Sequence, residues 1–317
     1  MTNLRIGINL WSQQTTWPEF LAAAQRVDRL GYDSLWTWDH IHAIFGDPQQ
    51  PIFEGYTTLA AWAMATTNVK LGLMVGANTF RNPGLVAKSV TTLDHISDGR
   101  AVLGIGGAWF DYEHEHHGIA FGKSVGERLD WLDESVAAMR TLLDRGTVTS
   151  PPGGHYAFDA LHQEPDPVQD HVPIMIGGNG RTKTLRTVAR HADIWNGFGT
   201  PDELGELNRV LDGYLAEEGR SLDSVERTVN LWLVIRDDPA EARREWEREM
   251  ALNTTPPDEE EIAQQRPILG NPEQVAARVR EYVAAGFETA LVELPAPYDA
   301  ETIERLIGEV KPLVDAG

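Results

Sequence analysis

Short apolar runs of strand length alternate with longer segments of helical periodicity along almost the whole chain. Apolar and β-branched residues dominate the short runs, while apolar positions recur every three to four residues in the longer ones. This alternation is typical of parallel βα units. The eight predicted strands are Leu4–Leu10, Ser34–Asp39, Val69–Gly76, Ala101–Gly106, Val172–Gly177, Asp193–Gly197, Thr228–Arg236 and Thr289–Leu294.

The segments between these strands predict helices, several of which are followed by a glycine or a proline that stops them. The predicted helices are Trp17–Leu30, Leu85–Ile96, Val125–Leu143, Thr182–Arg190, Asp202–Glu218, Pro239–Met250, Pro272–Ala285 and Ala300–Val314. An open sheet of eight parallel strands would leave two edges to cover, so the alternation favours a closed barrel. We therefore predict an α/β fold, a single (β/α)₈ TIM barrel domain over residues 1–317.

Two segments, at about 147–171 and 253–271, interrupt the alternation. Both are rich in proline and polar residues, and we expect them to be loop insertions at the C-terminal face of the barrel. Functional insertions in barrels usually follow a strand. Together with Ala43–Pro51, these loops should set the shape of the substrate pocket.

The cysteine content and the net charge exclude several kinds of catalytic site and partner. The 317 residues include no cysteine, which excludes thiol nucleophiles, disulfides, iron–sulfur clusters and thiolate zinc sites. The 27 Lys and Arg against 48 Asp and Glu give a net charge of −21, so we expect neither nucleic acid nor membrane as a partner. The first ten residues lack the pattern of a secretory signal, and no apolar run nears the roughly 20 residues that cross a bilayer. We expect a cytoplasmic protein.

The predicted strand ends carry glycine, tryptophan and amide residues with few charges. They include Asn9, Trp11, Trp38, Asn78, Gly104, Gly106, Gly107, Trp109, Trp195 and Asn196. A barrel mouth lined in this way suits a large flat ring better than a small charged substrate. His40, beside Asp39 at the end of the second strand, is a candidate for proton transfer. Its alternative role is to stack on a ligand, to hydrogen-bond to it, or to pack beneath a loop.

The run Gly177-Gly178-Asn179-Gly180-Arg181-Thr182 lies between a predicted strand and a helix. Glycines there let backbone N–H groups approach an anion at the helix N-terminus, and Arg181 or Thr182 can add donors, so the run predicts a phosphate site. The alternative is a tight turn without a ligand. The cluster His114, His116 and His117, with the pair His40 and His42, raises the possibility of a metal-dependent hydrolase. We predict no metal site, because the strand ends offer no carboxylates or histidines that complete a coordination sphere.

Ordered motifs over nearly the whole chain resemble those of the bacterial luciferase-like, flavin-dependent oxidoreductases. The matching stretches include Leu35-Trp36-Thr37-Trp38-Asp39-His40, Asn78-Thr79-Phe80-Arg81-Asn82-Pro83, Leu103-Gly104-Ile105-Gly106-Gly107, Pro173-Ile174-Met175-Ile176-Gly177-Gly178-Asn179-Gly180 and Ala192-Asp193-Ile194-Trp195-Asn196. The resemblance implies a (β/α)₈ barrel that binds FMN or the deazaflavin coenzyme F420 at the strand C-termini. It is closest to the F420-dependent branch, which transfers hydride.

The resemblance also implies roles for residues. It places Asp39 and His40 beside the ring, a non-proline cis peptide within Met74–Val75–Gly76 under it, and the phosphate on the glycines from Gly177. From this we predict His40 and Asp39 as catalytic residues. The predicted cofactor-binding residues are Asp39, Met74, Val75, Gly76, Asn78, Gly106, Gly107, Trp109, Gly177, Gly178, Asn179, Gly180, Arg181 and Thr182.

Trp109 departs from the pattern of the sugar-phosphate dehydrogenases of the F420 branch, which have a catalytic carboxylate there. The departure argues against a sugar-phosphate substrate, and Trp109 either walls an apolar pocket or belongs to a structural turn. Our leading hypothesis is an F420-dependent oxidoreductase that acts on a small organic substrate.

Two alternatives stay open. One is an FMN-dependent two-component monooxygenase fed by a separate reductase, and the other is a non-catalytic flavin-binding protein. Family members are commonly homodimers, and the apolar helix face Leu59–Met64 could form the interface, although core packing explains it equally well.

Overall fold

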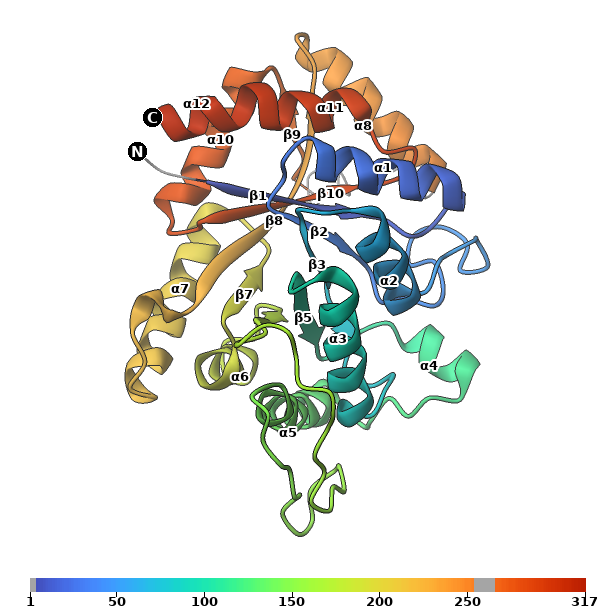
Figure 1. Cartoon of the computed structure of the whole chain (residues 1–317). Helices are drawn as coiled ribbons and strands as arrows, with labels where there is room; N and C mark the ends of the chain where they lie inside the picture. Colours follow the sequence, from blue (N-terminus) through green and yellow to red (C-terminus); the bar gives the residue numbers. More distant parts are fainter. Residues whose placement is uncertain (1–3, 254–265) are drawn as a thin grey trace.

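Eight parallel strands close into a barrel in the computed structural model, which describes residues 4–253 and 266–317 (Figure 1). The strand order is β10–β1–β2–β3–β5–β6–β7–β8, and β8 pairs with β10 to close the ring. The barrel strands are β1 (Arg5–Leu10), β2 (Ser34–Thr37), β3 (Lys70–Leu73), β5 (Ala101–Gly106), β6 (Ile174–Gly177), β7 (Ile194–Gly197), β8 (Glu226–Ile235) and β10 (Thr289–Leu294). The predicted (β/α)₈ fold is confirmed.

Helices surround the barrel on its outer face (Figure 1). They are α1 (Trp17–Arg29), α2 (Gly55–Ala65), α3 (Pro83–Ser97), α4 (Asp111–His117), α5 (Val125–Leu143), α6 (Thr184–His191), α7 (Pro201–Glu217), α8 (Pro239–Asn253), α10 (Pro272–Ala284), α11 (Ala300–Arg305) and α12 (Lys311–Ala316). The described residues also contain two short helical segments, Leu222–Ser224 and Leu306–Val310. Helix α2 contains the apolar stretch Leu59–Met64, whose Leu59, Trp62 and Ala63 are buried in the core.

Three helices begin with the same capping sequence. Thr16, Thr200 and Asn271 each cap a helix and form a capping box with the residue three positions later. Each of these helices also has a proline in its first turn, where the missing N–H has no helical partner to lose. These signals explain why α1, α7 and α10 start at or within one residue of the predicted positions.

The two expected insertions differ in their position. Segment 147–171 follows helix α5, not a strand, and packs along α3: the His95 ring contacts the Asp166 carbonyl at 2.8 Å, and Gln169 donates to Asp94. None of its residues lines the main cavity described below. The expectation that it shapes the main cavity is therefore wrong, although its Tyr156 does reach Asn78 beyond the end of β3.

The second insertion adds a short strand to the barrel. Within 253–271, β9 (Ile268–Gly270) pairs in parallel with the C-terminal half of β8, from Leu233 to Ile235. Residues 254–265 of this predicted insertion lie outside the described residues. A two-residue strand, β4 (Gly76–Ala77), pairs with the end of β5.

Within the described residues, no helix combines the length and the apolar character that a bilayer crossing requires.

Candidate active site

A cavity of about 990 Å³ opens at the C-terminal ends of the barrel strands. Its lining comes mainly from residues that follow β2, β3, β5, β6 and β7 or lie at the ends of these strands, together with Asn230, Leu231 and Trp232 on β8 and Glu293 on β10. This is the face on which active sites of such barrels lie, and the volume suits a drug-sized or tricyclic ligand. Of the predicted pocket-shaping segment Ala43–Pro51, Ile44 and Phe45 line the cavity.

Asp39 is buried and held by an ion pair. Both of its oxygens accept hydrogen bonds from the Arg81 guanidinium, at 2.7 and 2.9 Å, and Oδ2 also accepts from the amide N–H of Ala77 at 2.9 Å. Arg81 donates to Glu54 as well, at 2.7 Å. Burial alone would lower the pKa of Arg81, but the Asp39 carboxylate raises it above its ordinary value. These contacts make Asp39 an anchor that ties the end of β2 to the segment after β3.

His40 forms a pair with Glu113 at the cavity wall. The His40 Nδ1 atom lies 2.9 Å from Oε2 of Glu113, whose Oε1 accepts from the N–H groups of Ile41 and His42 at 2.6 and 3.1 Å. Burial would raise the pKa of Glu113, but these bonds, with His40 foremost, hold it below its usual range. An ionised carboxylate only accepts, so Nδ1 carries the hydrogen, and Nε2 is the nitrogen that can exchange a proton with a ligand.

Val75 projects into a space that glycines leave open. The Met74–Val75 peptide bond is cis and lies where the resemblance places it. A Cβ on Gly106 would approach Val75 Cγ2 to 2.7 Å, and one on Gly177 would approach Val75 Cγ1 to 2.9 Å. Met74, Val75, Gly76, Gly106 and Gly107 all line the cavity. The glycines thus admit Val75 beside the floor of the cavity, and no side chain larger than hydrogen fits at either position.

Only part of the segment predicted to bind phosphate lines the cavity. Gly177, Gly178, Asn179 and Gly180 line the cavity, and Gly178 adopts a φ of +126° that favours glycine. Arg181 and Thr182 are exposed and are not among the lining residues; Arg181 lies 3.6 Å from Glu206. Thr184, at the start of α6, lines the cavity in their place, as does Arg266, which is paired with Glu203 at 2.8 Å. No sequence signal distinguished Arg266, because it comes from a different loop.

Asn78 faces away from the main cavity. Its Nδ2 donates to the Tyr156 hydroxyl at 3.2 Å, and its Oδ1 accepts from Ser135 at 2.5 Å. It borders a smaller cavity of about 200 Å³ together with Trp131 and His155. Asn78 therefore joins β4 to helix α5 and the 147–171 segment, and its predicted contact with a ring stays a prediction.

Aromatic side chains form the rim of the main cavity. Trp109 is 61% exposed, and its ring centroid lies 5.7 Å from that of His40 with an edge-on geometry. Trp38, Phe45, Phe198 and Trp232 add further apolar wall. Trp11 and Trp195, which we expected at the mouth, are fully buried and do not line it. Such a wall selects flat or apolar ligands.

Sequence reasoning missed Glu293, which lies on β10 opposite Asn9 of β1. It is 7% exposed and faces the cavity. Burial raises the pKa of its carboxyl to about 7, although hydrogen bonds from Asn9, Trp11 and Trp38 favour the charged form. Its position at a strand end was visible in the sequence, but nothing there showed that the side chain points inward.

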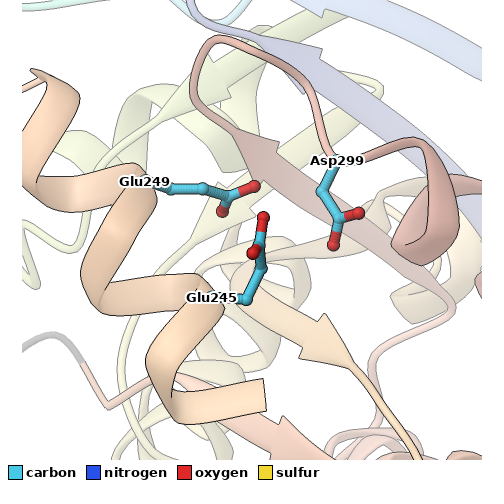
Figure 2. A group of neighbouring side chains, drawn as sticks. All are labelled: Glu245, Glu249 and Asp299. Atoms are coloured by element: carbon cyan, nitrogen blue, oxygen red, sulfur yellow. The ribbon is translucent and has the colours of Figure 1, made fainter. Parts of the chain in front are cut away.

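Of the histidines considered as a metal site, His42 has its ring centroid 5.1 Å from that of His117 and 6.0 Å from that of His116, whereas His40 is paired with Glu113. His114 is buried, with Nδ1 near the Phe110 carbonyl and Nε2 2.6 Å from Thr79, and burial lowers its pKa. One acidic group in the described ranges does bring three carboxylates together, those of Glu245, Glu249 and Asp299 (Figure 2). It lies on α8 and before α11, outside the cavity lining, and Arg236 contacts Asp299 at 2.8 Å while Arg248 pairs with Glu245.

With this geometry established, comparisons with known proteins give the class. A family model described as luciferase-like monooxygenase matches residues 2–289, so the chain belongs to that family. An F420-dependent glucose-6-phosphate dehydrogenase of Kineococcus radiotolerans is 26% identical over an alignment of 337 residues. The alignment covers 98% of this chain and 97% of the relative.

Two solved structures have the same fold. An F420-dependent secondary alcohol dehydrogenase, in complex with an F420–acetone adduct, superposes with a TM-score of 0.82 at 20% identity and covers 98% of this chain and 99% of its own. The oxygenating constituent of 3,6-diketocamphane monooxygenase from Pseudomonas putida, in complex with FMN, has a TM-score of 0.76, also at 20% identity and with coverage of 98% and 99%.

Proposed function

We propose that this protein is a coenzyme F420-dependent oxidoreductase that transfers hydride between the deazaflavin and a small carbonyl compound, alcohol or activated alkene. The observation that carries the proposal is the His40–Glu113 pair on the wall of a cavity with an aromatic rim. Hydride transfer to or from an oxygen-bearing carbon requires a matching proton transfer, and a histidine oriented by a buried carboxylate supplies it.

The lining residues fit a ring with an anionic tail. Val75, Gly106 and Gly107 would hold the ring, and Gly177 to Gly180 with Thr184 and Arg266 would hold the phosphate, since backbone N–H groups near a helix N-terminus favour an anion. When bound, the deazaflavin would supply the carbon that gives or takes the hydride. For an alcohol, His40 would take the hydroxyl proton at Nε2, and Glu113 would stabilise the resulting imidazolium.

Trp109 argues against a sugar phosphate as substrate. Its indole occupies the position after the strand-end glycines and borders the cavity next to His40. A large apolar ring there provides no charged or hydrogen-bonding partner for several hydroxyls and a phosphate. The substrate side of the proposal is therefore a small, mostly apolar molecule.

The second candidate is an FMN-dependent monooxygenase with a separate reductase. The aromatic rim favours it, because oxygen chemistry on a flavin needs a cavity that excludes water. The two candidates predict different ligands and different consumption of oxygen. We also propose that the protein is a homodimer located in the cytoplasm.

The test is a titration of tryptophan fluorescence with F420 and, separately, with FMN, since Trp38, Trp109 and Trp232 line the cavity. We expect quenching by F420 at micromolar concentrations, followed by F420-dependent turnover of secondary alcohols, carbonyls or enones without oxygen uptake. Binding of FMN alone, with oxygen uptake in the presence of a reductase, would replace this proposal by the second candidate. Binding without turnover of any substrate class would favour a non-catalytic protein.

A further inference from the structure

Glu293 lies on the wall of the active-site cavity, yet none of the roles proposed above uses it. It occupies the end of β10, where its backbone pairs with Asn9 of β1 on one side and with Trp232 of β8 on the other. Buried carboxyl groups are rare unless they are paired with a cation or bind something. The partners of Glu293 decide between these two cases.

Every protein group that hydrogen-bonds to Glu293 is a neutral donor. Asn9 Nδ2 and Trp11 Nε1 donate to Oε2 at 2.7 and 2.8 Å, and Asn230 Nδ2 donates to Oε1 at 3.0 Å. The Asn230 side chain is fixed in turn, because its Oδ1 accepts from Asn196 at 2.8 Å. These groups all donate to Glu293, so they favour its carboxylate form, but none of them neutralises the charge.

No cation compensates the carboxylate within the described part of the chain. Glu293 forms no ion pair there, and its neighbours from β1, β8 and the end of β2 are amides and indoles. The other titratable groups that line the cavity are Asp39, His40, Glu113, His114, Glu203, Arg266 and Tyr282. Asp39, Glu113 and Glu203 are each paired with a cation or a histidine of their own. Consistent with this, burial raises the pKa of Glu293 to about 7.

A ligand that fills the cavity removes the water that solvates Glu293. The three neutral donors do not neutralise the carboxylate, so a further donor from the ligand stabilises it, and a charge-assisted hydrogen bond is about twice as strong as a neutral one. We propose that Glu293 is a specificity-determining residue that accepts a hydrogen bond from an N–H or O–H group of the ligand bound in this cavity. The assignment rests on the proposed function and goes beyond it, since it names the group that the ligand must present.

Binding through this contact is linked to a proton. Near neutral pH part of the protein carries the proton on Glu293, and a ligand donor selects the carboxylate form, so the proton is released to solvent. Both FMN and F420 carry an imide N–H on the ring, which makes them suitable probes. The dissociation constant of the probe should therefore fall as the pH rises from 6 to 8.

The experiment compares the native protein with Glu293→Gln and with the matched control Glu288→Gln, whose glutamate is exposed on the surface just before β10. Fluorescence titrations with FMN and with F420 at pH 6, 7 and 8 give the dissociation constants, and calorimetry in two buffers of different ionisation enthalpy gives the protons released. We expect the native protein and the control to bind about three- to tenfold more tightly at pH 8 than at pH 6. Glu293→Gln should lack this tighter binding at pH 8, and it should release fewer protons when it binds the probe. The FMN phosphate itself titrates near pH 6, and the difference between variants removes its contribution.

The outcomes separate the two proposals. Binding that is retained with the same pH dependence in Glu293→Gln as in the native protein would overturn the role of Glu293 and leave the proposed function intact. No binding of either probe by the native protein would overturn the proposed function, and this assignment with it. Should Glu293→Gln not fold, infrared spectroscopy of the native protein decides: the band of a protonated carboxyl should disappear on ligand binding, and its persistence would contradict the assignment.

Discussion

Asp39 and His40 are neighbours in the chain, but their side chains have different partners. Asp39 is fully engaged by Arg81 and the Ala77 N–H, whereas His40 is held through Nδ1 alone by Glu113. A carboxylate that already accepts three hydrogen bonds, two of them from a guanidinium, is poorly placed to exchange a proton, while a ring with one free nitrogen can do so. At the residue scale the two predicted catalytic residues therefore differ: Asp39 is a structural anchor, and His40 is the residue that we propose as the proton carrier.

His40→Ala should lower turnover by about 10²- to 10⁴-fold, the range for removal of a general acid or base, while the cofactor dissociation constant changes little. Steady-state kinetics and a fluorescence titration measure the two effects. Glu113→Gln should lower turnover by about 10- to 100-fold, because the imidazolium loses its partner. The matched control is Glu115→Gln, on the exposed side of α4. An equal loss of turnover in Glu113→Gln and Glu115→Gln would contradict a functional role for the His40–Glu113 pair.

Asp39→Asn should lower the free energy of unfolding by about 1 to 3 kcal/mol, since it leaves the Arg81 guanidinium, with 22% of its side chain exposed, to Glu54 alone. Chemical denaturation measures the loss. Asp144→Asn, which removes an exposed ion pair with Arg140, is the control and should cost less than about 0.5 kcal/mol. Unchanged stability together with a large loss of turnover would instead assign Asp39 to the chemistry.

The sequence alone placed most of these residues near the right strand end but not their partners. Asp39, His40 and Gly177–Gly180 could be predicted because strand ends follow from periodicity. The contacts of Asp39 with Arg81, and of His40 with Glu113, join segments about 40 and 70 residues apart, and a single sequence carries no signal for such pairing. Glu293 was missed for the same reason.

At the scale of elements, glycines set how closely neighbouring strands and side chains approach. A Cβ on Gly104 of β5 would lie 1.8 Å from the Leu73 carbonyl oxygen of β3, a backbone atom that cannot move aside. In contrast, Gly213 in α7 has no neighbour within 4 Å of its added Cβ. The two positions form a natural pair of tests.

Gly104→Ala should destabilise the protein by more than about 3 kcal/mol or prevent folding, because the strands must separate to admit the methyl group. Gly213→Ala should stabilise it by about 0.5 to 1 kcal/mol, since alanine is the better helix former. Thermal unfolding followed by circular dichroism compares the two variants. A tolerated alanine at 104 would contradict the strand packing described for β3 and β5.

Helix α8 brings Glu249 into a buried position beside Asp299 and Glu245 (Figure 2). Burial raises the pKa of Glu249 to about 8, and the two neighbouring carboxylates act in the same direction. The folded state therefore holds the Glu249 proton more tightly than the unfolded state. The contribution of this proton to the free energy of unfolding is fully present below pH 4.5 and is lost as the pH rises to about 8.

The glutamine in Glu249→Gln cannot ionise. Between pH 5 and pH 9 the free energy of unfolding should therefore fall by about 1 to 3 kcal/mol less in this variant than in the native protein. Urea unfolding at several pH values measures this difference. Glu247→Gln, a half-exposed position on the same helix, serves as the control. Parallel pH profiles for Glu249→Gln and the native protein would show that Glu249 is not protonated in the fold.

For the whole molecule, the barrel could be predicted from the sequence because eight strand signals recur in order and each hydrophobic run is buried. The sequence identified Leu59–Met64 as an apolar helix face but did not give the bounds of α2, since its sequence is apolar on nearly all sides and lacks a helical stripe. The insertion at 147–171 does not line the main cavity as expected, because it folds back on α3 and contacts Asn78, and its sequence carries no signal for this packing.

The expected homodimer gives a prediction at this scale. Met64 on α2 and Leu85 on α3 are large apolar side chains that are 77% and 63% exposed, on helices that lie next to each other in the ring (Figure 1). If they belong to the interface, Met64→Glu should raise the dimer dissociation constant at least about tenfold, since a buried charge would lack a partner. Sedimentation velocity over a range of concentrations measures this. A native protein that sediments as a monomer at all concentrations would contradict the expectation.

The pairing of β1 with β10 has a consequence for how the protein is made. Arg5 and Thr289 are 284 residues apart, so at roughly 5 to 20 residues per second a ribosome needs on the order of 15 to 60 s to deliver the second strand after the first. During that interval β1 can pair with β2, but its other edge stays open to the wrong strand. The nascent chain therefore passes through a period in which this edge is exposed to non-native pairing, and that period ends only when the last strand of the ring is translated.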